Sequence, residues 1–393
     1  MHNKCELTIL MPCLNEAKTL ETCIRKARTF IESYNISAEI LIADNGSSDD
    51  SANIALKEGA RIIQVPIKGY GSALIAGINA AKGKYIIMGD ADDSYDFLDL
   101  AKFINKLREG YDFVMGNRFE GGIKKGAMPL IHRYFGNPVL SFTGRLFFKS
   151  PINDFNCGLR GFDTEKIKKL GLVTLGMEFA SEMVVKATIF GYKMTEVPII
   201  LYPDGRNCPP HLKTWHDGWN QLVFLLMHSP KWLFFIPSLL FFFISVGGLL
   251  CLLPGTVYFN KVGLDIHTLT IAGFMVILSY QLFLFAVFIR VFSLSHGLYI
   301  AKNKHKYFYN IFSLERGIIF GFMMLISGLG ILTFLLNKWI DLDFGRIQNV
   351  SSTFRLLIPS VTLISLGIQT VFASFFLKIL GISSKISYPN ENP

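Results

Sequence analysis

The sequence predicts an α/β domain with a mainly parallel sheet, followed by an all-α domain of four transmembrane helices. Up to about Ser229, short apolar runs alternate with amphipathic segments, and this alternation is typical of a parallel sheet covered by helices. Beyond that residue the chain is dominated by Phe, Leu and Ile in four long apolar stretches. The domains expected are an α/β domain over 1–210, an interfacial helix over 211–230, a membrane domain over 231–383 and a short tail over 384–393.

The α/β part is expected to contain six strands, each a short apolar run that ends at a polar turn. They are 7–11, 38–43, 61–65, 85–88, 111–116 and 195–201. Helices are expected over 16–34, from the turn 44–48 through 57, from 72 to about 81, over 97–108 and over 177–190. Asn15 is expected to cap the first of them, and 154–160 is expected to be a loop with charge at both ends.

Carboxylates follow the buried strand 85–88 directly. Asp90, Asp92 and Asp93 lie where ligands bind in an open α/β sheet, and Asp44 has the same kind of position after another strand. Carboxylates spaced i and i+2 can reach one hard divalent cation, which also binds substrate phosphates. The alternative is an acidic turn that binds no ligand. We predict a metal site formed by Asp90 and Asp92.

Further polar residues are predicted at the same edge of the sheet. Glu16 and Lys68 lie on adjacent loops, and Gly69 lies in a turn where glycine lets the backbone approach a ligand. Carboxylates for a cation, an acid for the N–H donors of a nucleobase and a lysine for phosphate together predict a pocket for a nucleoside diphosphate. This joint pattern is more specific than any one of its members.

Two segments are predicted to contact a membrane surface. Segment 128–149 mixes apolar and aromatic side chains with basic ones, as in helices that lie in a membrane interface, although a helix packed in the domain core is the alternative. Segment 212–228 carries Trp215 and Trp219, and tryptophan favours the headgroup region. His211, His216 and Asp217 resemble a metal cluster, but the interfacial interpretation is favoured.

Four apolar spans follow, each about 20 residues or longer, which is enough to cross a hydrocarbon core. They are 232–253, 269–289, 317–336 and 356–380. The connection 290–316 is the most basic, so it is predicted to lie in the cytosol with the α/β domain and both termini. Charges are nearly absent within the spans, which argues against an ion or proton pathway. Close helix packing is predicted at three glycines, Gly328, Gly330 and Gly367.

Composition argues against a disulfide-stabilised protein and against a nucleic-acid-binding protein. The 6 cysteines have no CxxC pair or metal-ligand spacing, so reduced thiols are expected. The net charge of +9 comes from basic residues that flank apolar spans, which favours an anionic membrane surface over nucleic acid as the partner.

The motifs of the α/β part resemble those of family-2 inverting glycosyltransferases, which have the GT-A fold, a Rossmann-like architecture. The resemblance covers roughly residues 5–230. It rests on four motifs, Pro12-Cys13-Leu14-Asn15-Glu16, Asp44-Asn45-Gly46-Ser47-Ser48-Asp49, Lys68-Gly69-Tyr70-Gly71 and Asp90-Ala91-Asp92. Asn117-Arg118 and 154–160 extend it toward the branch of polyprenyl-phosphate, or dolichol-phosphate, mannose and glucose synthases.

The resemblance implies a role for each matched residue. Asp90 and Asp92 would bind Mg²⁺ or Mn²⁺ and the donor diphosphate, Asp92 as a catalytic residue. Arg118 and Arg133 would surround the lipid phosphate and the leaving diphosphate. Apart from the resemblance, Asp154, Glu178 and Glu182 are candidates for orienting the arginines or the sugar, and the alternative is that they are ordinary loop and helix acids. The substrate-binding residues expected are Pro12, Asn15, Glu16, Asp44, Lys68, Gly69, Asp90, Asn137 and Arg160.

Three positions depart from the family pattern. Asn45 replaces a frequent second acid, and Ser94 stands where a glutamine often assists the metal. Asn137 sits where serine is common, four residues after Arg133.

The function predicted is the transfer of one hexose from a UDP- or GDP-sugar to a polyprenyl phosphate on the cytosolic face of a membrane, with inversion. Two alternatives remain. One is a processive polysaccharide synthase, although no Gln-x-x-Arg-Trp stretch is present. The other is a catalytically silent membrane scaffold, although its structure would not require both Asp90 and Asp92. Homo-oligomerisation is left open.

Overall fold

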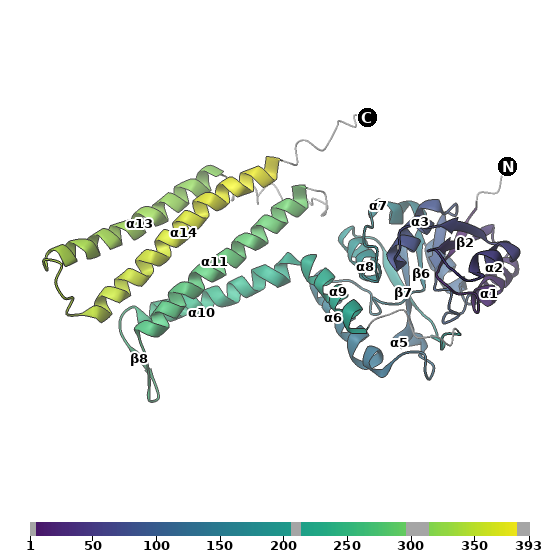
Figure 1. The fold of residues 1–393 in the computed structure, drawn as a ribbon, viewed down its shortest axis with the longest axis horizontal. Helices are drawn as coiled ribbons and strands as arrows, with labels where there is room; N and C mark the ends of the chain where they lie inside the picture. The colour runs from purple at the N-terminus through teal and green to yellow at the C-terminus, as the bar shows by residue number, and fades with distance from the viewer. Residues whose placement is uncertain (1–4, 206–213, 296–313, 383–393) are drawn as a thin grey trace. The chain divides into compact units, whose positions relative to one another are not determined.

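The structure is a computed structural model, and it describes residues 5–205, 214–295 and 314–382. The chain divides into two compact units, Met1–His228 and Ser229–Pro393 (Figure 1). The predicted tail over 384–393, His211 and most of the basic connection 290–316 lie outside the described residues.

The first unit is built on one sheet of 7 strands in the order β3-β2-β1-β4-β6-β5-β7. Strand β6 is antiparallel to both of its neighbours, and all other pairs are parallel, which confirms the mainly parallel α/β fold. The strands are β1 (Leu7–Cys13), β2 (Ala38–Asp44), β3 (Arg61–Gln64), β4 (Tyr85–Met88), β5 (Phe113–Asn117), β6 (Arg160–Asp163) and β7 (Met194–Pro198).

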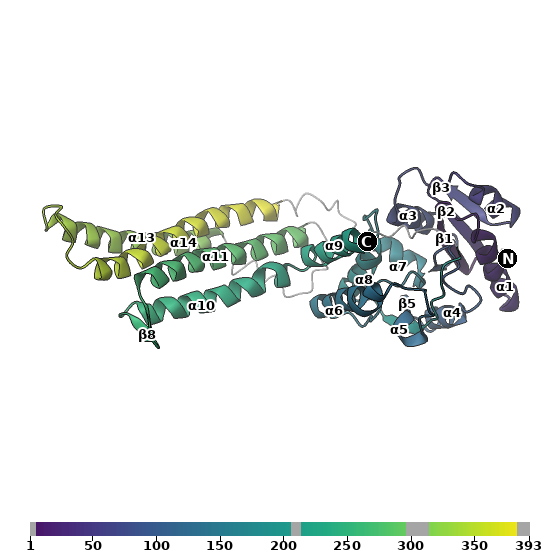
Figure 2. The same ribbon diagram turned by 60° about the horizontal axis from the view of Figure 1, so that its bottom comes forward.

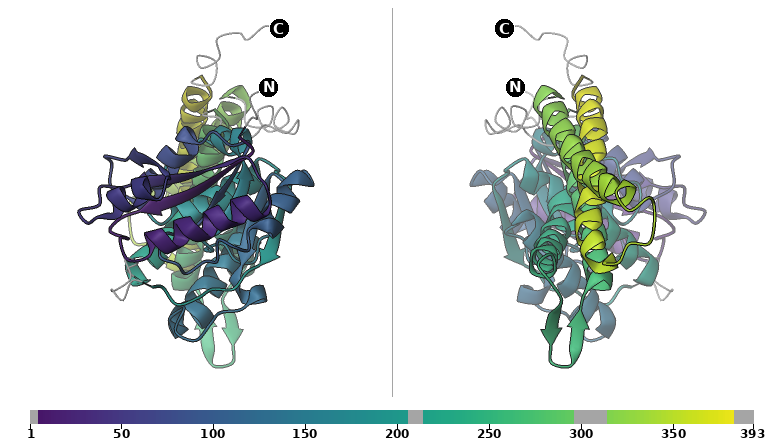
Figure 3. Two further views of the ribbon diagram at one scale, coloured as in Figure 1. Left: turned by 90° about the vertical axis from the view of Figure 1, so that its right-hand side faces the viewer. Right: turned by 90° about the vertical axis from the view of Figure 1, so that its left-hand side faces the viewer.

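Helices cover both faces of this sheet. Figures 1 and 2 show α3, α7 and α8 on one side and α1 and α2 on the other, and Figure 3 shows α1 in purple in front of the sheet. The helices of the unit are α1 (Leu20–Ser33), α2 (Ser51–Lys57), α3 (Tyr70–Ala80), α4 (Ala101–Arg108), α5 (Arg118–Gly121), α6 (Asn137–Phe148), α7 (Thr164–Lys169), α8 (Phe179–Ile189) and α9 (Thr214–Met227).

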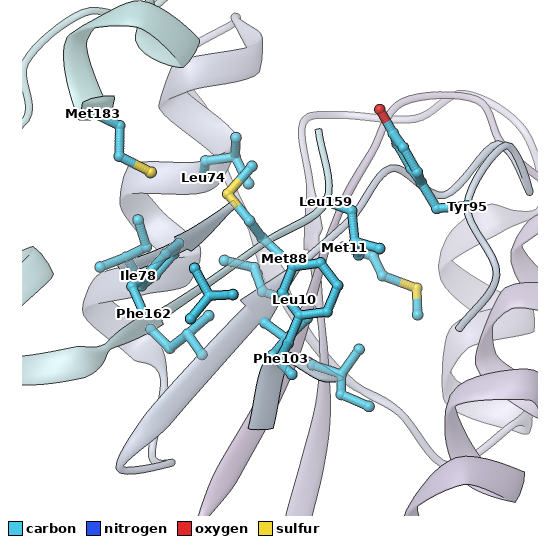
Figure 4. Packing of buried hydrophobic residues seen from close by; sticks show 14 of the residues in the cluster. Leu10, Met11, Leu74, Ile78, Met88, Tyr95, Phe103, Leu159, Phe162 and Met183 are labelled. Atoms are coloured by element: carbon cyan, nitrogen blue, oxygen red, sulfur yellow. The ribbon is translucent and has the colours of Figure 1, made fainter. Parts of the chain in front are cut away.

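The apolar runs of the sequence form the core of the unit. All four residues of β4 are buried, as expected of a central strand in a sheet covered on both faces. Figure 4 shows Leu10 of β1, Met88 of β4 and Phe162 of β6 packed together with Leu74 and Ile78 of α3. This core fixes the strand ends from which the site residues extend.

The expected loop over 154–160 is wrong at its end. Arg160 begins β6, a strand that lies between β4 and β5 and pairs with both. Its sequence, Arg-Gly-Phe-Asp, has no apolar run, so periodicity does not reveal it. Its position depends on the two flanking strands rather than on local propensity.

The first helix begins later than expected. Asn15 does not cap it, because Asn15 has a left-handed backbone with φ of 59°, and α1 starts at Leu20 after Thr19. Asparagine tolerates this conformation better than most residues. The chain from Asn15 to Thr19 is therefore a loop at the ligand edge of the sheet. Similarly, α4 begins at Ala101 rather than at 97.

The segment predicted over 128–149 is helical from Leu130 and contains a π-helical turn, η1 (His132–Gly136), that continues into α6. In this turn the backbone N–H of Asn137 donates to the carbonyl of His132, five residues back. Pro138 has no N–H with which to continue the regular ladder, which accounts for the irregular turn before it. A second π-helical turn, η2 (Lys231–Phe235), likewise precedes a proline, Pro237.

The second unit contains four helices that are long and apolar enough to cross a membrane, within the residues that the structure describes. The candidate spans are Lys231–Leu252, Ile266–Ser293, Leu314–Ile340 and Val350–Leu380, and they confirm the four predicted spans. The helices are α10 (Ile236–Leu252), α11 (Ile266–Ser295), α13 (Leu314–Ile340) and α14 (Val350–Ile382). A hairpin of β8 (Val257–Phe259) and β9 (Val262–Leu264) joins α10 to α11.

Helices α13 and α14 lie side by side and pack closely at glycines, as predicted (Figures 1 and 3). A Cβ on Gly328 would lie 2.8 Å from the carbonyl oxygen of Ser360, and one on Gly367 would lie 2.7 Å from that of Gly321. Small residues allow this approach between transmembrane helices. The prediction for Gly330 is wrong, because a Cβ there would meet nothing within 4 Å.

Candidate active site

The site lies at the carboxyl ends of β1, β2 and β4. In the parallel register Cys13 is opposite Asp44, and Leu10 is opposite Met88, so the three strands end at the same edge. Strand β1 lies between β2 and β4 in the sheet. Pro12 belongs to β1 and is half-buried. The loops after these strands carry most of the predicted site residues.

The loops after β1 and β2 are joined by side-chain hydrogen bonds. Asn15 Oδ1 accepts from the Ser48 backbone N–H at 2.8 Å, and the Asn15 N–H donates to Ser47 Oγ at 2.9 Å. Ser47 Oγ also donates to Asp44 Oδ1 at 2.5 Å. Asn15 thus holds two loops together.

Glu16 and Asp44 are both buried at this edge, with exposed fractions of 6% and 2%. The backbone N–H of Glu16 donates to Ser51 Oγ at 2.9 Å. Cys13 precedes Glu16 in the chain and lies opposite Asp44 in the sheet, and burial raises the pKa of its thiol to about 11. The thiol is therefore protonated at neutral pH, and Cys13 does not supply a nucleophile.

Asn45 ties the loop after β2 to the loop after β3. Its Nδ2 donates to the carbonyls of Val65 and Ile67 at 3.1 and 2.7 Å, and its Oδ1 accepts from the Gly69 N–H at 2.7 Å. An aspartate could not make the first two contacts, which explains why an amide stands where an acid is frequent. Apart from this departure from the family pattern, no feature of the sequence indicates the role of Asn45.

Lys68 is held over the same turn. Its Nζ donates to the carbonyl oxygens of Asn45 and Gly46 at 2.8 and 3.1 Å. Its ammonium group therefore lies at the ligand edge, but the contact with a phosphate stays a prediction. Gly69 has φ of 136°, and a Cβ there would lie 2.2 Å from the carbonyl oxygen of Leu175, so this position requires glycine.

We expect Asn45→Asp to lower the stability of the first unit by about 1–3 kcal/mol, because it removes two donors and places a carboxylate against two carbonyls. The measurement is thermal unfolding of the purified protein in detergent. Asn105→Asp is the matched control, since Asn105 is exposed on α4 and the change in charge is the same. Equal unfolding temperatures of the two variants would contradict the role of Asn45.

The two acids predicted to bind metal follow β4 in the turn before Ser94. Asp90 Oδ1 accepts from the Tyr70 hydroxyl at 2.9 Å. Asp92 Oδ1 accepts from the backbone N–H of Ser94 at 3.1 Å and from its Oγ at 2.5 Å. Asp93 has a different partner, Lys26 Nζ at 2.8 Å, and belongs to a partly exposed ion pair.

The two carboxylates fit a cation whose remaining coordination positions are filled by the substrate and by water. Within the described residues, no group of three or more His, Cys, Asp or Glu side chains could hold a metal ion. Mg²⁺ is usually bound through one or two carboxylates together with waters and substrate phosphates, so Asp90 and Asp92 are sufficient protein ligands. The metal site itself stays a prediction.

Arg118 and Asp154 form a buried ion pair. The Nε and Nη2 groups of Arg118 donate to the two carboxylate oxygens of Asp154, each at 2.7 Å, and the Arg118 backbone N–H adds a third contact at 3.1 Å. The Asp154 side chain is fully buried and that of Arg118 is 8% exposed. This geometry fits one of the two roles suggested for Asp154, that of orienting Arg118, and the role itself stays a prediction.

This pairing leaves one nitrogen of Arg118 for another anion. The hydrogen bonds from the Arg118 guanidinium to Asp154 use Nε and Nη2 and do not involve Nη1. The pKa of His132 is lowered mainly by burial and also by the positive charge of Arg118. This effect indicates that Arg118 lies near η1. Arg133 follows in that turn, and no ion pair is found for it in the described part of the chain. The Arg133 guanidinium lies over the Tyr134 ring, 5.5 Å from its centre, and its contact with a substrate anion stays a prediction.

Asn137 follows at the start of α6. Its Oδ1 accepts from Asn156 Nδ2 at 3.0 Å, and its own Nδ2 contacts the Met128 sulfur at 3.4 Å. The contact with Asn156 links α6 to the loop that carries Asp154. Whether Asn137 binds substrate stays a prediction.

The geometry gives Arg160 a structural role. Its side chain is 1% exposed, and its guanidinium donates to the carbonyls of Phe155, Cys157 and Ala180 at 3.1, 2.8 and 2.8 Å. These bonds hold the loop before β6 against α8. A contact of Arg160 with substrate is therefore not supported by its surroundings.

Glu182 also acts on the backbone rather than on the arginines. Its carboxylate accepts from the N–H groups of Val173 and Thr174 and pairs with Lys186 at 2.7 Å. It fixes the loop between α7 and α8. Glu178 lies just before α8, where a Cβ on Gly176 would be 2.5 Å from its carboxylate.

We expect the stabilisation by Glu182 to be lost in acid. Burial opposes its ionisation, but the hydrogen bonds from Lys186 and Thr174 hold the pKa of the Glu182 carboxyl below its ordinary value. Its contribution is therefore complete above that ordinary value of 4.5 and is lost as pH falls through the lower folded-state pKa. Thermal unfolding from pH 7 to pH 3 should show that Glu182→Gln is the less stable protein at pH 7 and that the difference shrinks in acid. A constant difference, like that of the exposed Glu109→Gln control, would contradict this assignment.

The sequence comparisons agree with this architecture. Residues 8–171 match the family described as Glycosyl transferase family 2, and residues 287–381 match the family described as Glycosyltransferase family 2 C-terminal transmembrane region. The chain is 33% identical over 379 residues to the low-salt glycan biosynthesis hexosyltransferase Agl6 of Haloferax volcanii, over 95% of this chain and 89% of that protein.

Two further proteins are similar over about half of the chain. The dolichyl-phosphate hexose transferase of Haloferax volcanii is 29% identical over 196 residues, which are 49% of this chain and 82% of that protein. The crystal structure of glucosyl-3-phosphoglycerate synthase from Mycobacterium tuberculosis in complex with Mn²⁺, UDP and glucosyl-3-phosphoglycerate matches with a TM-score of 0.47 and 18% identity, over 57% of this chain and 80% of that one.

The chain belongs to glycosyl transferase family 2, and it carries the C-terminal transmembrane region found in that family. It is a membrane-associated glycosyltransferase. The predicted family and the predicted class of enzyme are confirmed.

Proposed function

We propose that this glycosyltransferase moves one hexose from a nucleotide-diphosphate sugar to a polyprenyl phosphate at the membrane surface, with inversion at the anomeric carbon. The observation that carries the proposal is the placement of two acids, Asp90 and Asp92, at the ligand edge of the sheet, in a unit that also holds Arg118 and Arg133 beside an exposed apolar helix. The first pair suits a donor diphosphate and the second suits a lipid phosphate.

The donor is bound at the carboxyl ends of β1, β2 and β4. Buried Glu16 and Asp44 accept hydrogen bonds from the N–H groups of the base or the hydroxyls of the ribose. Lys68 and the backbone at Gly69 approach the diphosphate, since cationic and N–H groups there favour an anion. The name of the similar hexosyltransferase from Haloferax volcanii supports a hexose as the group transferred.

Asp90 and Asp92 hold a divalent cation, Mg²⁺ or Mn²⁺, together with the donor diphosphate. When bound, the cation supplies positive charge that stabilises the leaving nucleoside diphosphate. Ser94 keeps Asp92 in place through its Oγ and its backbone N–H, so it supports the site without the glutamine that the family often has there.

The acceptor needs no general base. A phosphate monoester has a second pKa of about 6, so a polyprenyl phosphate is mostly a dianion at pH 7 and is already nucleophilic. One of its oxygens forms the new bond to the anomeric carbon from the face opposite the leaving diphosphate, and the bond to that diphosphate breaks. The guanidinium groups of Arg118 and Arg133 neutralise the two anions and hold them in line.

The acceptor lipid enters from the bilayer along η1 and α6. Large apolar side chains are exposed on this segment, and the basic residues Arg133, Arg145 and Lys149 lie among them. Such a segment lies in a membrane interface with its apolar side chains in the lipid. The exposed apolar residues are Leu130, Ile131, Tyr134, Phe135, Val139, Phe142 and Leu146.

The topology proposed places the first unit and both termini in the cytosol of a multi-pass membrane protein. It rests on the basic connection 290–316 between the second and third spans. Helix α9 lies at the membrane surface as the interfacial helix, because Trp215 and Trp219 are 75% and 62% exposed. The name of the dolichyl-phosphate hexose transferase supports a lipid phosphate as the acceptor.

The test is a panel of UDP- and GDP-hexoses given to the purified protein in detergent with Mg²⁺ and either a polyprenyl phosphate or the matching polyprenol. We expect release of the nucleoside diphosphate with at least one donor, only when the lipid carries its phosphate. Equal release of the nucleoside diphosphate with the polyprenol would contradict the assignment of a lipid phosphate as the acceptor. Absence of release with every donor would favour the catalytically silent scaffold, and a ladder of long products would favour a processive synthase.

A further inference from the structure

The hydroxyl of Tyr70 contacts one of the two acids of the site. Tyr70 is the first residue of α3, and its hydroxyl donates to Asp90 Oδ1 at 2.9 Å. Tyr70 is not among the site residues predicted from the sequence, since a tyrosine between two glycines is typical of a turn. Its hydroxyl fixes one oxygen of the Asp90 carboxylate.

The backbone that carries Tyr70 is held rigidly. The N–H of Gly71 donates to the carbonyl of Leu175 at 2.9 Å, and a Cβ on Gly71 would lie 2.2 Å from the carbonyl oxygen of Thr174. The residues on this loop are fixed in turn by the carboxylate of Glu182. Tyr70 therefore extends toward Asp90 from a backbone that is packed directly against another backbone segment.

The other oxygen of Asp90 is confined as well. A Cβ on Gly158 would lie 2.4 Å from Asp90 Oδ2 and 3.0 Å from the ring of Tyr95. The Gly158 N–H donates to the Tyr95 hydroxyl at 2.8 Å, which holds this part of the loop in place. The Asp90 carboxylate thus lies between the Tyr70 hydroxyl and the backbone at Gly158.

We propose that Tyr70 is a positioning residue that orients the Asp90 carboxylate for the divalent cation of the donor complex. The proposal rests on the proposed function, in which Asp90 and Asp92 bind that cation. A carboxylate that binds a metal is commonly held by a hydrogen bond from a neighbouring group, and loss of that group typically lowers metal affinity about 10- to 100-fold. With the hydroxyl removed, Asp90 can rotate away from the geometry that the cation needs.

The test is Mn²⁺ binding by Tyr70→Phe, measured by electron paramagnetic resonance on the purified full chain in detergent with UDP or GDP present. We expect the Kd for Mn²⁺ to rise by about tenfold or more relative to the unmodified protein. In transfer assays we expect excess Mn²⁺ to restore most of kcat. A merely structural role would lower the unfolding temperature and leave the Mn²⁺ dependence unchanged.

Tyr192→Phe is the matched control, because it also removes one tyrosine hydroxyl, the donor to the Lys166 carbonyl at 2.8 Å. Its Kd for Mn²⁺ should equal that of the unmodified protein. Gly158→Ala provides a second variant, and it should also weaken Mn²⁺ binding, because its Cβ displaces Asp90. If the unmodified protein binds Mn²⁺ and Tyr70→Phe binds it equally well, the role of Tyr70 is overturned and the proposed function stands. If the unmodified protein binds no Mn²⁺ with either nucleotide, the metal assignment fails and the role of Tyr70 fails with it.

Discussion

Asp92→Asn is expected to lower sugar transfer by about a thousandfold or more while leaving the fold intact. A bound cation supplies several kcal/mol of charge stabilisation in the transition state, and about 4 kcal/mol corresponds to a factor of about a thousand. The amide keeps an oxygen that accepts from Ser94, as Asp92 Oδ1 does, so the turn after β4 should persist. The measurement is the initial rate of hexose transfer with saturating Mg²⁺.

Asp93→Asn is the control for this variant. It removes the same charge one residue away, where the carboxylate pairs with Lys26 and the backbone has φ of 61°. Asparagine accepts this left-handed conformation, so transfer should stay close to that of the unmodified protein. Comparable rates of hexose transfer for Asp92→Asn and Asp93→Asn would contradict the assignment of Asp92 as a metal ligand.

Asp154→Asn is expected to destabilise the first unit by about 3–5 kcal/mol, because it leaves the buried guanidinium of Arg118 without its counter-charge. For a unit of this size the unfolding temperature should fall by roughly 10 °C. Arg118→Lys should not preserve the pair, since an ammonium group cannot make the two parallel contacts of a guanidinium. Thermal unfolding in detergent measures both effects.

Asp99→Asn controls for the loss of an ion pair as such. Asp99 pairs with Lys102 on the surface, with side chains 52% and 47% exposed. Such pairs contribute about 1 kcal/mol at most, so its unfolding temperature should hardly change. Equal shifts for Asp99→Asn and Asp154→Asn would mean that the buried pair does not organise the site.

The apolar runs of the sequence were sufficient to predict the central strands. Runs such as 85–88 are continuously apolar because both faces of the strand are covered. Such a run can be recognised without knowing which strands lie beside it. Strand β6 could not be found in the same way, because Arg160 and Gly161 interrupt it. The pairing with β4 and β5 decides its conformation, and no pattern within four residues records those partners.

The acids of the site were accessible to sequence reasoning because strand ends in parallel sheets converge at one edge. The roles of neutral residues were not. Asn45 acts through three side-chain hydrogen bonds and Tyr70 through one, and their partners lie 20 to 24 residues away in the chain. Arg160 is a different case, since a charged residue in a matched motif suggested a ligand contact, and in the structure its guanidinium donates to backbone carbonyls.

The most direct test of the account is the composition of the lipid product. The purified protein is incubated with Mg²⁺, a polyprenyl phosphate and the donor hexose identified by the panel, and the extracted lipid is analysed by mass spectrometry and by NMR of the anomeric centre. We predict a single species that carries one hexose on the phosphate, with the anomeric configuration opposite to that of the donor. A lipid with several hexoses, retention of configuration, or release of nucleoside diphosphate without any glycosylated lipid would contradict the account.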